Sequence, residues 1–285
     1  MIPPQTMTRR QTFYHLSAAG GNGATAIGRA VLGGAFSVVC GITLLAAGGY
    51  MASLASPKDL PNPGAVFDVL WTLITDPFYN AGPNDKGIGL QLFASLQRVF
   101  TGFAIGSVVA IPLGILLGSN RLVYRLVDPV VQILRPVSPL AWFPIGLATF
   151  QSAGNATIFM IFITSLWPTV INTAFGVRSV PITYRQVAQV FHFSRWKYLT
   201  KVLLPYSLPH ILTGLRLSMG IAWLVIVAGE MLSGGTGIGF FVWDSWNALS
   251  LERVMAAILL IGVIGLLLDR GFSFLVNRFS YTETE

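Results

Sequence analysis

Charged side chains are scarce in this chain of 285 residues. Asp, Glu, Lys and Arg make up 10% of the sequence, whereas soluble domains carry about 25%. Residues 30–57, 99–120 and 136–177 hold no charged side chain at all. A helix rises ~1.5 Å per residue and the hydrocarbon core of a membrane is ~30 Å thick, so the third run is long enough for about two crossings. This pattern excludes a soluble domain and predicts an all-α integral membrane protein.

Residues that bind metals or do covalent chemistry are also few. The single cysteine, Cys40, excludes an intramolecular disulfide, and together with His15, His192 and His210 it is too little for a zinc site. No nucleophile–base cluster is apparent, and no G-x-x-x-x-G-K-[ST] loop that would hold ATP phosphates occurs. We therefore expect no catalytic residue, no metal and no cofactor in this chain.

The basic residues indicate how the chain lies in the membrane. The net charge is +7, but the Lys and Arg residues are spread over several loops, which argues against nucleic-acid binding. With the N-terminus inside, only Lys58, Lys86 and Arg253 fall in outer segments, while most other basic residues fall in inner ones. The positive-inside rule then predicts a multi-pass protein of a bacterial inner membrane with both termini in the cytoplasm.

The apolar runs divide into six predicted spans. They lie at about residues 30–54, 92–117, 127–150, 156–176, 211–232 and 253–276. They would form one transmembrane domain, residues 30–278, between cytoplasmic tails at 1–29 and 279–285. The third span holds Pro129, Pro136, Pro139 and Pro144. We expect it to be broken, because so many prolines cannot sit in one regular helix that faces lipid.

Two loops are predicted on the outer side. In residues 55–90, Asn62 and Pro63 resemble a helix N-cap and a first-turn proline, and the apolar residues that follow have helical spacing. This predicts an amphipathic helix lying on the membrane surface. Residues 233–250 are rich in glycine near their start and are expected to form a loop.

The most informative segment is the polar, basic stretch at residues 183–209, which lies between two predicted spans. The run from Thr183 to Gln186 fits a capping box and predicts the start of a helix. His192 is predicted to begin a turn, and Ser194 to cap a second short helix. Two short helices that expose Phe and Trp side chains predict contact with the groove of a partner. The alternative is an interfacial loop that binds lipid headgroups.

This segment resembles the "EAA" coupling loop of ATP-binding-cassette importer permeases. The matching positions are Gln186-Val187-Ala188, His192 and Leu204-Pro205. The resemblance implies that separate ATPase subunits, which hold ATP and Mg, contact this loop. The implied coupling residues are Arg185, Gln186, Val187, Ala188, Phe191, His192, Phe193, Ser194, Arg195, Leu204 and Pro205. The chain departs from the family pattern at Gln186, where Glu is usual, and at His192, where Gly is usual.

Further motifs extend the resemblance over residues 60–278. The sequences SLQRV at 95–99, LRP at 134–136, PLAWFP at 139–144 and LTGLR at 212–216 look like the permease branch that serves nitrate, bicarbonate, taurine and alkanesulfonates. Residues 83–87 and 233–244 look most like the cyanobacterial type of nitrate and nitrite permease. The resemblance implies a type I importer (MetI-like) fold, a second copy of the permease, and an external binding protein or lipoprotein.

Charged and aromatic residues within the spans are candidates for the translocation pathway. Charges inside spans usually face a cavity or a partner, because a charge at the centre of the bilayer costs at least ~2.5–3.5 kcal/mol. The candidates are Arg98, Arg135, Trp142, Trp223 and Glu230. An arginine would favour passage of anions, but structural pairing is the alternative, and Glu230 could neutralise Arg98. For the two tryptophans the alternative is helix packing.

Two other classes of function remain open from the sequence. A secondary carrier or channel working alone would suit six spans with broken helices, but it would have no use for an exposed coupling segment. A membrane enzyme would need a polar catalytic cluster, which the sequence does not offer. Copurification with an ATPase would distinguish a permease of an ATP-driven importer from these two classes.

Overall fold

The computed structural model describes residues 61–82 and 85–279, and every regular element among them is helical. The chain divides into two units, Met1–Ala65 and Val66–Glu285. The predicted first span at 30–54, the tail at 1–29 and residues 280–285 lie outside the described residues. Helix α3 (Pro63–Thr75) begins at the predicted proline, and the Asn62 side chain accepts a hydrogen bond from the Gly64 N–H at 2.9 Å. The predicted helix start is therefore confirmed.

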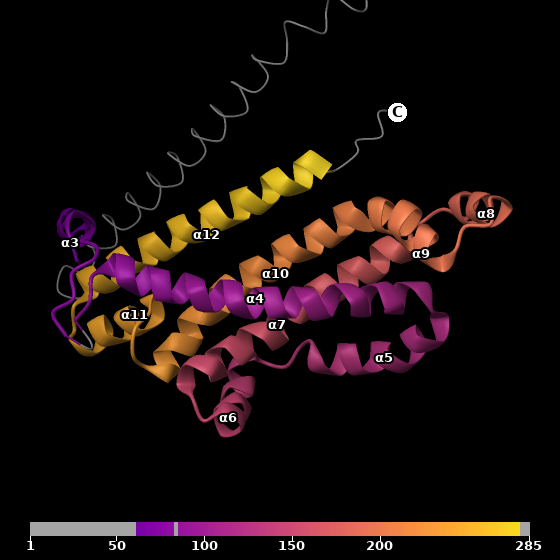
Figure 1. Cartoon of the computed structure of the whole chain (residues 1–285). Coiled ribbons are helices and arrows are strands. Elements are labelled where there is room, and N and C mark those ends of the chain that lie inside the picture. The colour runs from indigo at the N-terminus through magenta and orange to yellow at the C-terminus, as the bar shows by residue number, and fades with distance from the viewer. Residues whose placement is uncertain (1–60, 83–84, 280–285) are drawn as a thin grey trace, which may run out of the picture. The chain divides into compact units, whose positions relative to one another are not determined.

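Three long helices form the centre of the second unit. Helix α7 (Ala153–Arg178) packs against α4 (Ile88–Ser119) on one side and α10 (Leu204–Ser233) on the other. Figure 1 shows these helices running side by side, with α12 (Leu251–Phe279) beside α10. The main core lies where they meet, around residues such as Val99, Ile161 and Ile226.

Small residues let α4 and α7 approach closely. Gly102, Gly106, Ala110, Gly114 and Gly118 follow one another at every fourth position of α4, which places them on one face. A Cβ added at Gly102 would lie 2.8 Å from the Cβ of Ile161 on α7, which is too close for two carbon atoms. Small residues at this spacing are typical of helix packing within membranes, where association depends on close contact of backbones.

The third predicted span is broken, as its prolines indicate. It consists of α5 (Arg121–Leu134) and α6 (Pro139–Phe150), which are bent by 99° at the break between them. Pro136 lies in the break and Pro139 begins α6, where a missing N–H does not remove a helical hydrogen bond. The span also begins at Arg121, several residues before the predicted start.

The fifth predicted span is much longer than expected. Helix α9 (Arg195–Tyr198), a π-helical turn at Leu199–Leu203 and α10 form one helix of 39 residues. Leu204 and Pro205 lie at the start of α10, so the segment leads into the fifth span as a continuous helix that begins well before the predicted residue 211. Pro205 has no N–H to donate, and the π-helical turn lies directly before it.

The predicted outer loop at residues 233–250 is also wrong in part. It contains α11 (Ile238–Asn247), whose buried residues Ile238, Phe241, Val242 and Ser245 have helical spacing. The glycines at 234, 235, 237 and 239 concealed this pattern. Within the described residues, four helices are long and apolar enough to cross a membrane, or five if the bent pair counts as one span.

Candidate functional site

The segment for which a coupling role is predicted consists of α8 (Ile182–Val190), a short turn and α9, and it is called the coupling segment below. Its N-terminus differs from the prediction: Pro181 takes the cap position, and no side chain caps the helix, so the capping box at Thr183 is not formed. Helix α8 begins directly after Pro181. Thr183 therefore lies inside the first turn, where its backbone is already helical.

The turn between the two helices keeps the geometry that the coupling-loop pattern requires. His192 has a φ of 49°, in the left-handed region that glycine usually occupies. The Phe193 N–H donates to the Ala188 carbonyl at 2.9 Å. As predicted, the Ser194 hydroxyl caps α9 by accepting a hydrogen bond from the Lys197 N–H at 3.2 Å. The chain therefore makes a left-handed turn without the usual glycine.

Large apolar side chains at this segment have little protein around them. Val190, Phe191 and Trp196 are 74%, 69% and 73% exposed, whereas Ala188 is buried. The rings of Phe191 and Phe193 lie 6.5 Å apart, and Lys197 Nζ lies 4.3 Å above the Phe193 ring. Because exposed apolar groups at the polar end of a bundle are unfavourable in water, this arrangement suits a surface that a partner covers.

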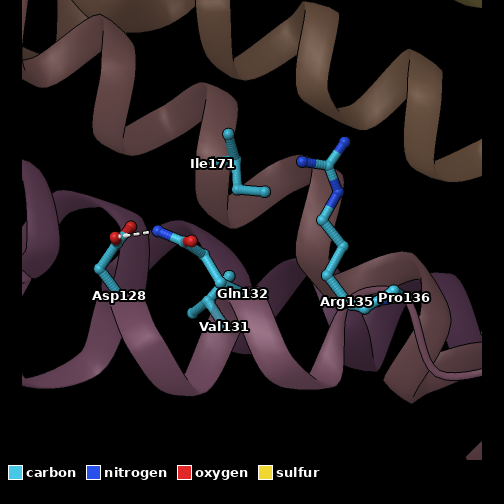
Figure 2. Close-up of a pocket in the computed structure, with 6 residues that line it drawn as sticks. All are labelled: Asp128, Val131, Gln132, Arg135, Pro136 and Ile171. Carbon is cyan, nitrogen blue, oxygen red and sulfur yellow. Dashed lines mark hydrogen bonds between the residues drawn. The ribbon is translucent and has the colours of Figure 1, made fainter.

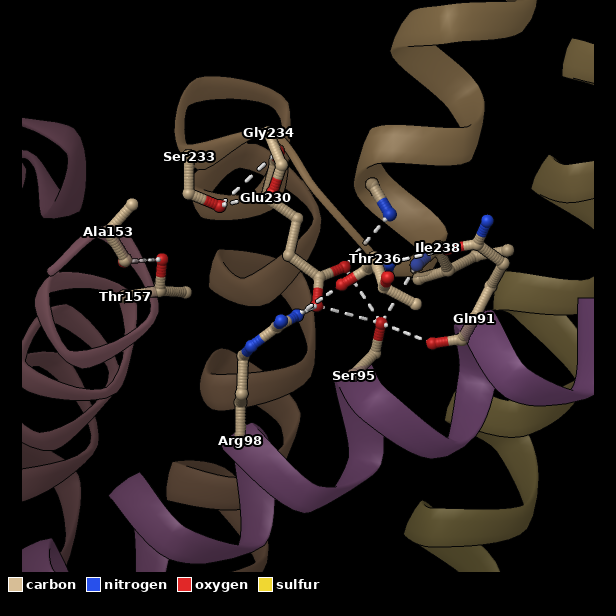
Figure 3. A network of polar contacts seen from close by, with 12 residues as sticks. Gln91, Ser95, Arg98, Ala153, Thr157, Glu230, Ser233, Gly234, Thr236 and Ile238 are labelled. Carbon is tan, nitrogen blue, oxygen red and sulfur yellow. Dashed lines mark hydrogen bonds and ion pairs between the residues drawn. The ribbon is translucent and has the colours of Figure 1, made fainter. Parts of the chain in front are cut away.

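At the other end of α4 and α10, a buried polar network surrounds Glu230. Figure 3 shows Arg98 and Ser95 of α4 directed at the Glu230 carboxylate of α10. Arg98 Nη1 lies 2.6 Å from Glu230 Oε1, and Ser95 Oγ lies 2.7 Å from Oε2. Glu230 is fully buried. A buried carboxylate is stable only when it is paired and hydrogen-bonded, and these contacts meet that requirement.

The same network holds the glycine-rich segment before α11. The Gly239 N–H donates to Glu230 Oε2 at 3.0 Å, and the Ile238 N–H donates to Ser95 Oγ at 2.8 Å. Arg98 Nη1 also donates to the Thr236 carbonyl at 2.6 Å. At Gly237 a Cβ would run into the Glu230 carboxylate. The network therefore joins the ends of α4, α10 and α11.

Arg98, which the sequence suggested as a pathway residue, therefore forms an ion pair with Glu230. The neutralisation by Glu230 that the sequence suggested is present, so the charge of Arg98 is compensated by a contact within the chain. Sequence reasoning did not assign Gln91 to this site, although Gln91, Ser95 and Arg98 lie on one face of α4 by helical spacing. That spacing of polar residues within a span was the signal available.

Arg135 lies in a different environment. Figure 2 shows it extending from the end of α5 towards Ile171 of α7, beside a pocket of about 580 Å³. Asp128 and Gln132 line the same pocket, and Gln132 Nε2 donates to Asp128 Oδ2 at 2.5 Å. Among the described residues Arg135 has no ion-pair partner. Within the part of the chain that the structure describes, the pocket is therefore lined by one cation, Arg135, and one carboxylate, Asp128, which form no ion pair with each other.

The remaining candidates take structural positions. Trp223 is buried and donates from Nε1 to the Ile261 carbonyl of α12 at 3.0 Å, which is the packing alternative considered for it. Trp142 lies on α6, partly buried against the main core. Arg216, a further charged residue within the predicted fifth span, forms a two-contact ion pair with Asp269 of α12, at 2.7 and 2.8 Å. Sequence reasoning did not predict Asp269 as the partner, because no local spacing links two helices so far apart in the chain.

Comparison with known proteins agrees with this architecture. Residues 110–281 match the model of a family described as "Binding-protein-dependent transport system inner membrane component". The chain belongs to this family. It is thus a multi-pass inner-membrane component of a transport system that depends on a binding protein, as its motifs indicated.

Individual relatives and solved structures support the same assignment. The chain is 48% identical to a nitrate import permease protein of Synechocystis sp., over 76% of this chain and 79% of that protein. It is also 48% identical to a bicarbonate transport system permease protein of Synechococcus elongatus, over 74% and 77% of the two chains. A structure of the MetNI methionine ABC transporter matches with a TM-score of 0.61 at 16% identity, covering 66% of this chain and 94% of that one. At this identity the match confirms the expected MetI-like fold alone.

Proposed function

We propose that this chain is the permease subunit of an ATP-driven importer that moves nitrate, and nitrite, into the cytoplasm. Two copies would form the pathway, ATPase subunits holding ATP and Mg would bind beneath, and an external binding protein or lipoprotein would deliver the anion. This assembly has six spans per chain, both termini in the cytoplasm, and the coupling segment α8–α9 on the cytoplasmic side. The distribution of basic residues supports this orientation.

The observation that carries the proposal is the exposed coupling segment. Phe191 and Trp196 are mostly exposed on two short helices, and the residues that the structure describes leave these side chains uncovered. The segment continues directly into α10 through one helix of 39 residues. A force applied at α9 would therefore reach the membrane through a continuous helix, without a flexible linker between them.

The surroundings of each candidate pathway residue suggest its role in transport. Arg135, without an ion-pair partner among the described residues, would supply positive potential for an anion at the pocket beside α7. Arg98 and Glu230 would instead hold the outer ends of α4, α10 and α11 together, so that opening the pathway on that side requires this network to move. Trp142, on α6 next to the break, would narrow the pathway.

Nitrate is proposed because a nitrate import permease is among the relatives at 48% identity, and because the glycine-rich motif at 233–244 resembles that type. A bicarbonate permease at the same identity supports bicarbonate as the second candidate. Calorimetry on the binding component that works with this chain would separate the two. Tight binding of nitrate supports the proposal, and binding of bicarbonate alone would replace it.

The coupling role is tested by copurification with the ATPase subunits. Phe191→Asp should remove the ATPase from the purified complex, because a charge would enter an apolar contact. Leu249→Asp is a matched control, since Leu249 is 85% exposed but follows α11, far from the coupling segment in sequence and structure. Loss of the ATPase in the control as well, or its retention in Phe191→Asp, would contradict the role of α8–α9.

A further inference from the structure

Four arginines gather in a cavity next to the coupling segment. The cavity has a volume of about 530 Å³, within the range of ~300–1,000 Å³ typical of small-molecule sites. Arg121 and Arg125 come from α5, Arg178 from the end of α7 and Arg185 from α8. The described residues that line it include no Asp or Glu. The four charges therefore repel one another, and none of the described lining residues supplies a counter-charge.

The positions of these arginines are defined by contacts around them. The Arg178 guanidinium stacks on the Tyr124 ring with Cζ 3.9 Å from its centre, and Nε donates to the Ala174 carbonyl at 3.2 Å. In the part of the chain that the structure describes, Nη1 and Nη2 of Arg178 have no protein acceptor. The Asn120 side chain caps α5 by accepting from the Leu122 N–H at 2.9 Å, which fixes the helix start that carries Arg121.

The cavity combines positive charge with an apolar wall. Leu117 from the end of α4, together with Val180 and Ile182 around the start of α8, line it beside the arginines. Guanidinium groups bind phosphate oxygens in pairs and are the preferred side chains for that group. Basic pockets between membrane helices on the cytoplasmic side bind phospholipid headgroups. A cavity lined by four guanidinium groups therefore fits a phosphate group, whose several oxygens can accept from more than one of them.

We propose that this cavity binds a phosphate group and thereby joins α8 to the ends of α4, α5 and α7. The phosphate belongs either to an anionic phospholipid of the adjacent leaflet or to a soluble phosphate. Binding makes the coupling helix and the membrane helices one rigid unit, because Arg185 of α8 and Arg178 of α7 then share one ligand. This effect on coupling rests on the proposed function, whereas the site itself does not.

Native mass spectrometry of the purified, delipidated complex tests binding directly. Phosphatidylglycerol should bind the wild-type complex, and the double variant Arg121→Gln/Arg125→Gln should bind it about 25-fold more weakly, at about fivefold for each arginine removed. Arg278→Gln is the matched control, because Arg278 is an exposed arginine in the last turn of α12 and does not line the cavity. A separate variant, Arg125→Lys, keeps the charge and should bind more tightly than Arg125→Gln, which a general loss of folding would not produce.

A second arm distinguishes the two sources of phosphate. Calorimetric titration with inorganic phosphate at millimolar concentration should show no binding if the lipid is the ligand, and arginine-dependent binding if a soluble phosphate is. The proposal is overturned if neither probe binds, or if the double variant binds both as well as the wild type does. It is also overturned if binding occurs only without the ATPase subunits, since their side chains would then occupy the cavity.

The effect of phosphate binding on coupling is measured separately, through the ATP turnover of the complex. If the ligand is the lipid, the transported anion should stimulate ATP turnover less in nanodiscs of phosphatidylcholine alone than in nanodiscs that also contain phosphatidylglycerol. If the ligand is a soluble phosphate, the stimulation should increase when that phosphate is added to nanodiscs of phosphatidylcholine alone. An unchanged response would overturn the stiffening role. Mass spectrometry reports on the cavity even if no ATPase joins the chain, so failure of the proposed function and failure of this site give different results.

Discussion

The two ends of the helix bundle differ in how far their charged and apolar side chains find partners within the described chain. At the end that carries α11, the buried Glu230 is paired with Arg98 and accepts further hydrogen bonds from Ser95 and Gly239. At the end that carries α8 and α9, large apolar side chains are exposed, and four arginines share a cavity that no acidic side chain lines among the described residues. Figure 1 shows these ends on opposite sides of the view. The first end is complete within one chain, and the second has the properties of a surface that needs partners.

The largest effect is expected at the complete end. Glu230→Ala leaves Arg98 without its buried partner, and breaking such a pair typically costs 3–5 kcal/mol. We expect the free energy of unfolding in mixed micelles to fall by about 3 kcal/mol or more. An unfolding free energy within about 1 kcal/mol of the wild type would show that the network contributes little, because exposed pairs give values of that size.

A smaller effect is expected at the incomplete end, and on assembly rather than folding. Phe191→Asp should weaken binding of the ATPase subunits by about 30-fold or more, which corresponds to a hot-spot loss of ~2 kcal/mol. The free energy of unfolding of the isolated chain should change little, because Phe191 is 69% exposed. If the Phe191→Asp variant unfolds more easily but still binds the ATPase subunits, this end of the bundle serves folding rather than assembly, and the comparison is contradicted.

Removing the N-terminal cap of α9 should lower the stability of that short helix only. Ser194→Ala removes the acceptor of the Lys197 N–H and should destabilise the short helix by about 1 kcal/mol. Hydrogen exchange of amides 195–198 should become about fivefold faster, while exchange in α7 stays the same. Ser194→Asp, which keeps an acceptor, serves as the control and should retain slow exchange.

The smallest effect is expected at the half-exposed ion pair. Asp269→Asn weakens the contact with Arg216, but the Asn side chain keeps an oxygen that can accept a hydrogen bond from the guanidinium, so the loss should be smaller than for Glu230→Ala. The same micelle unfolding measurement used for Glu230→Ala provides the comparison. If both substitutions had equal effects, burial would not explain the difference between the two pairs.

The sequence predicted most of the membrane architecture because charge-free runs and prolines act locally. The spans that became α4, α7 and α12, and the break between α5 and α6, follow from hydropathy and from the missing N–H of proline. The helix α11 was missed because four glycines precede or begin it. The length of α10 was underestimated because the span was drawn from hydropathy alone, whereas the helix continues through the polar residues before it, with a π-helical turn just before Pro205.

The candidate site was predictable where the pattern is local and less so where it is long-range. The Ser194 cap and the turn at His192 were readable from a few neighbouring residues. The contacts of Glu230 with Ser95 and Gly239, and the gathering of Arg121 with Arg178, depend on how distant helices pack. A single sequence contains no direct signal for such contacts, so only depth within the membrane suggested that Arg98 and Glu230 could meet.

The most direct test of the account is anion uptake into vesicles reconstituted with and without the ATPase subunits. With the ATPase, the binding component and ATP present, vesicles containing this chain should accumulate nitrate, and accumulation should stop when the ATPase is omitted or when Phe191 is replaced by Asp. Normal accumulation of nitrate by vesicles that contain this chain alone would contradict the proposal that α8 and α9 receive the work of a separate ATPase.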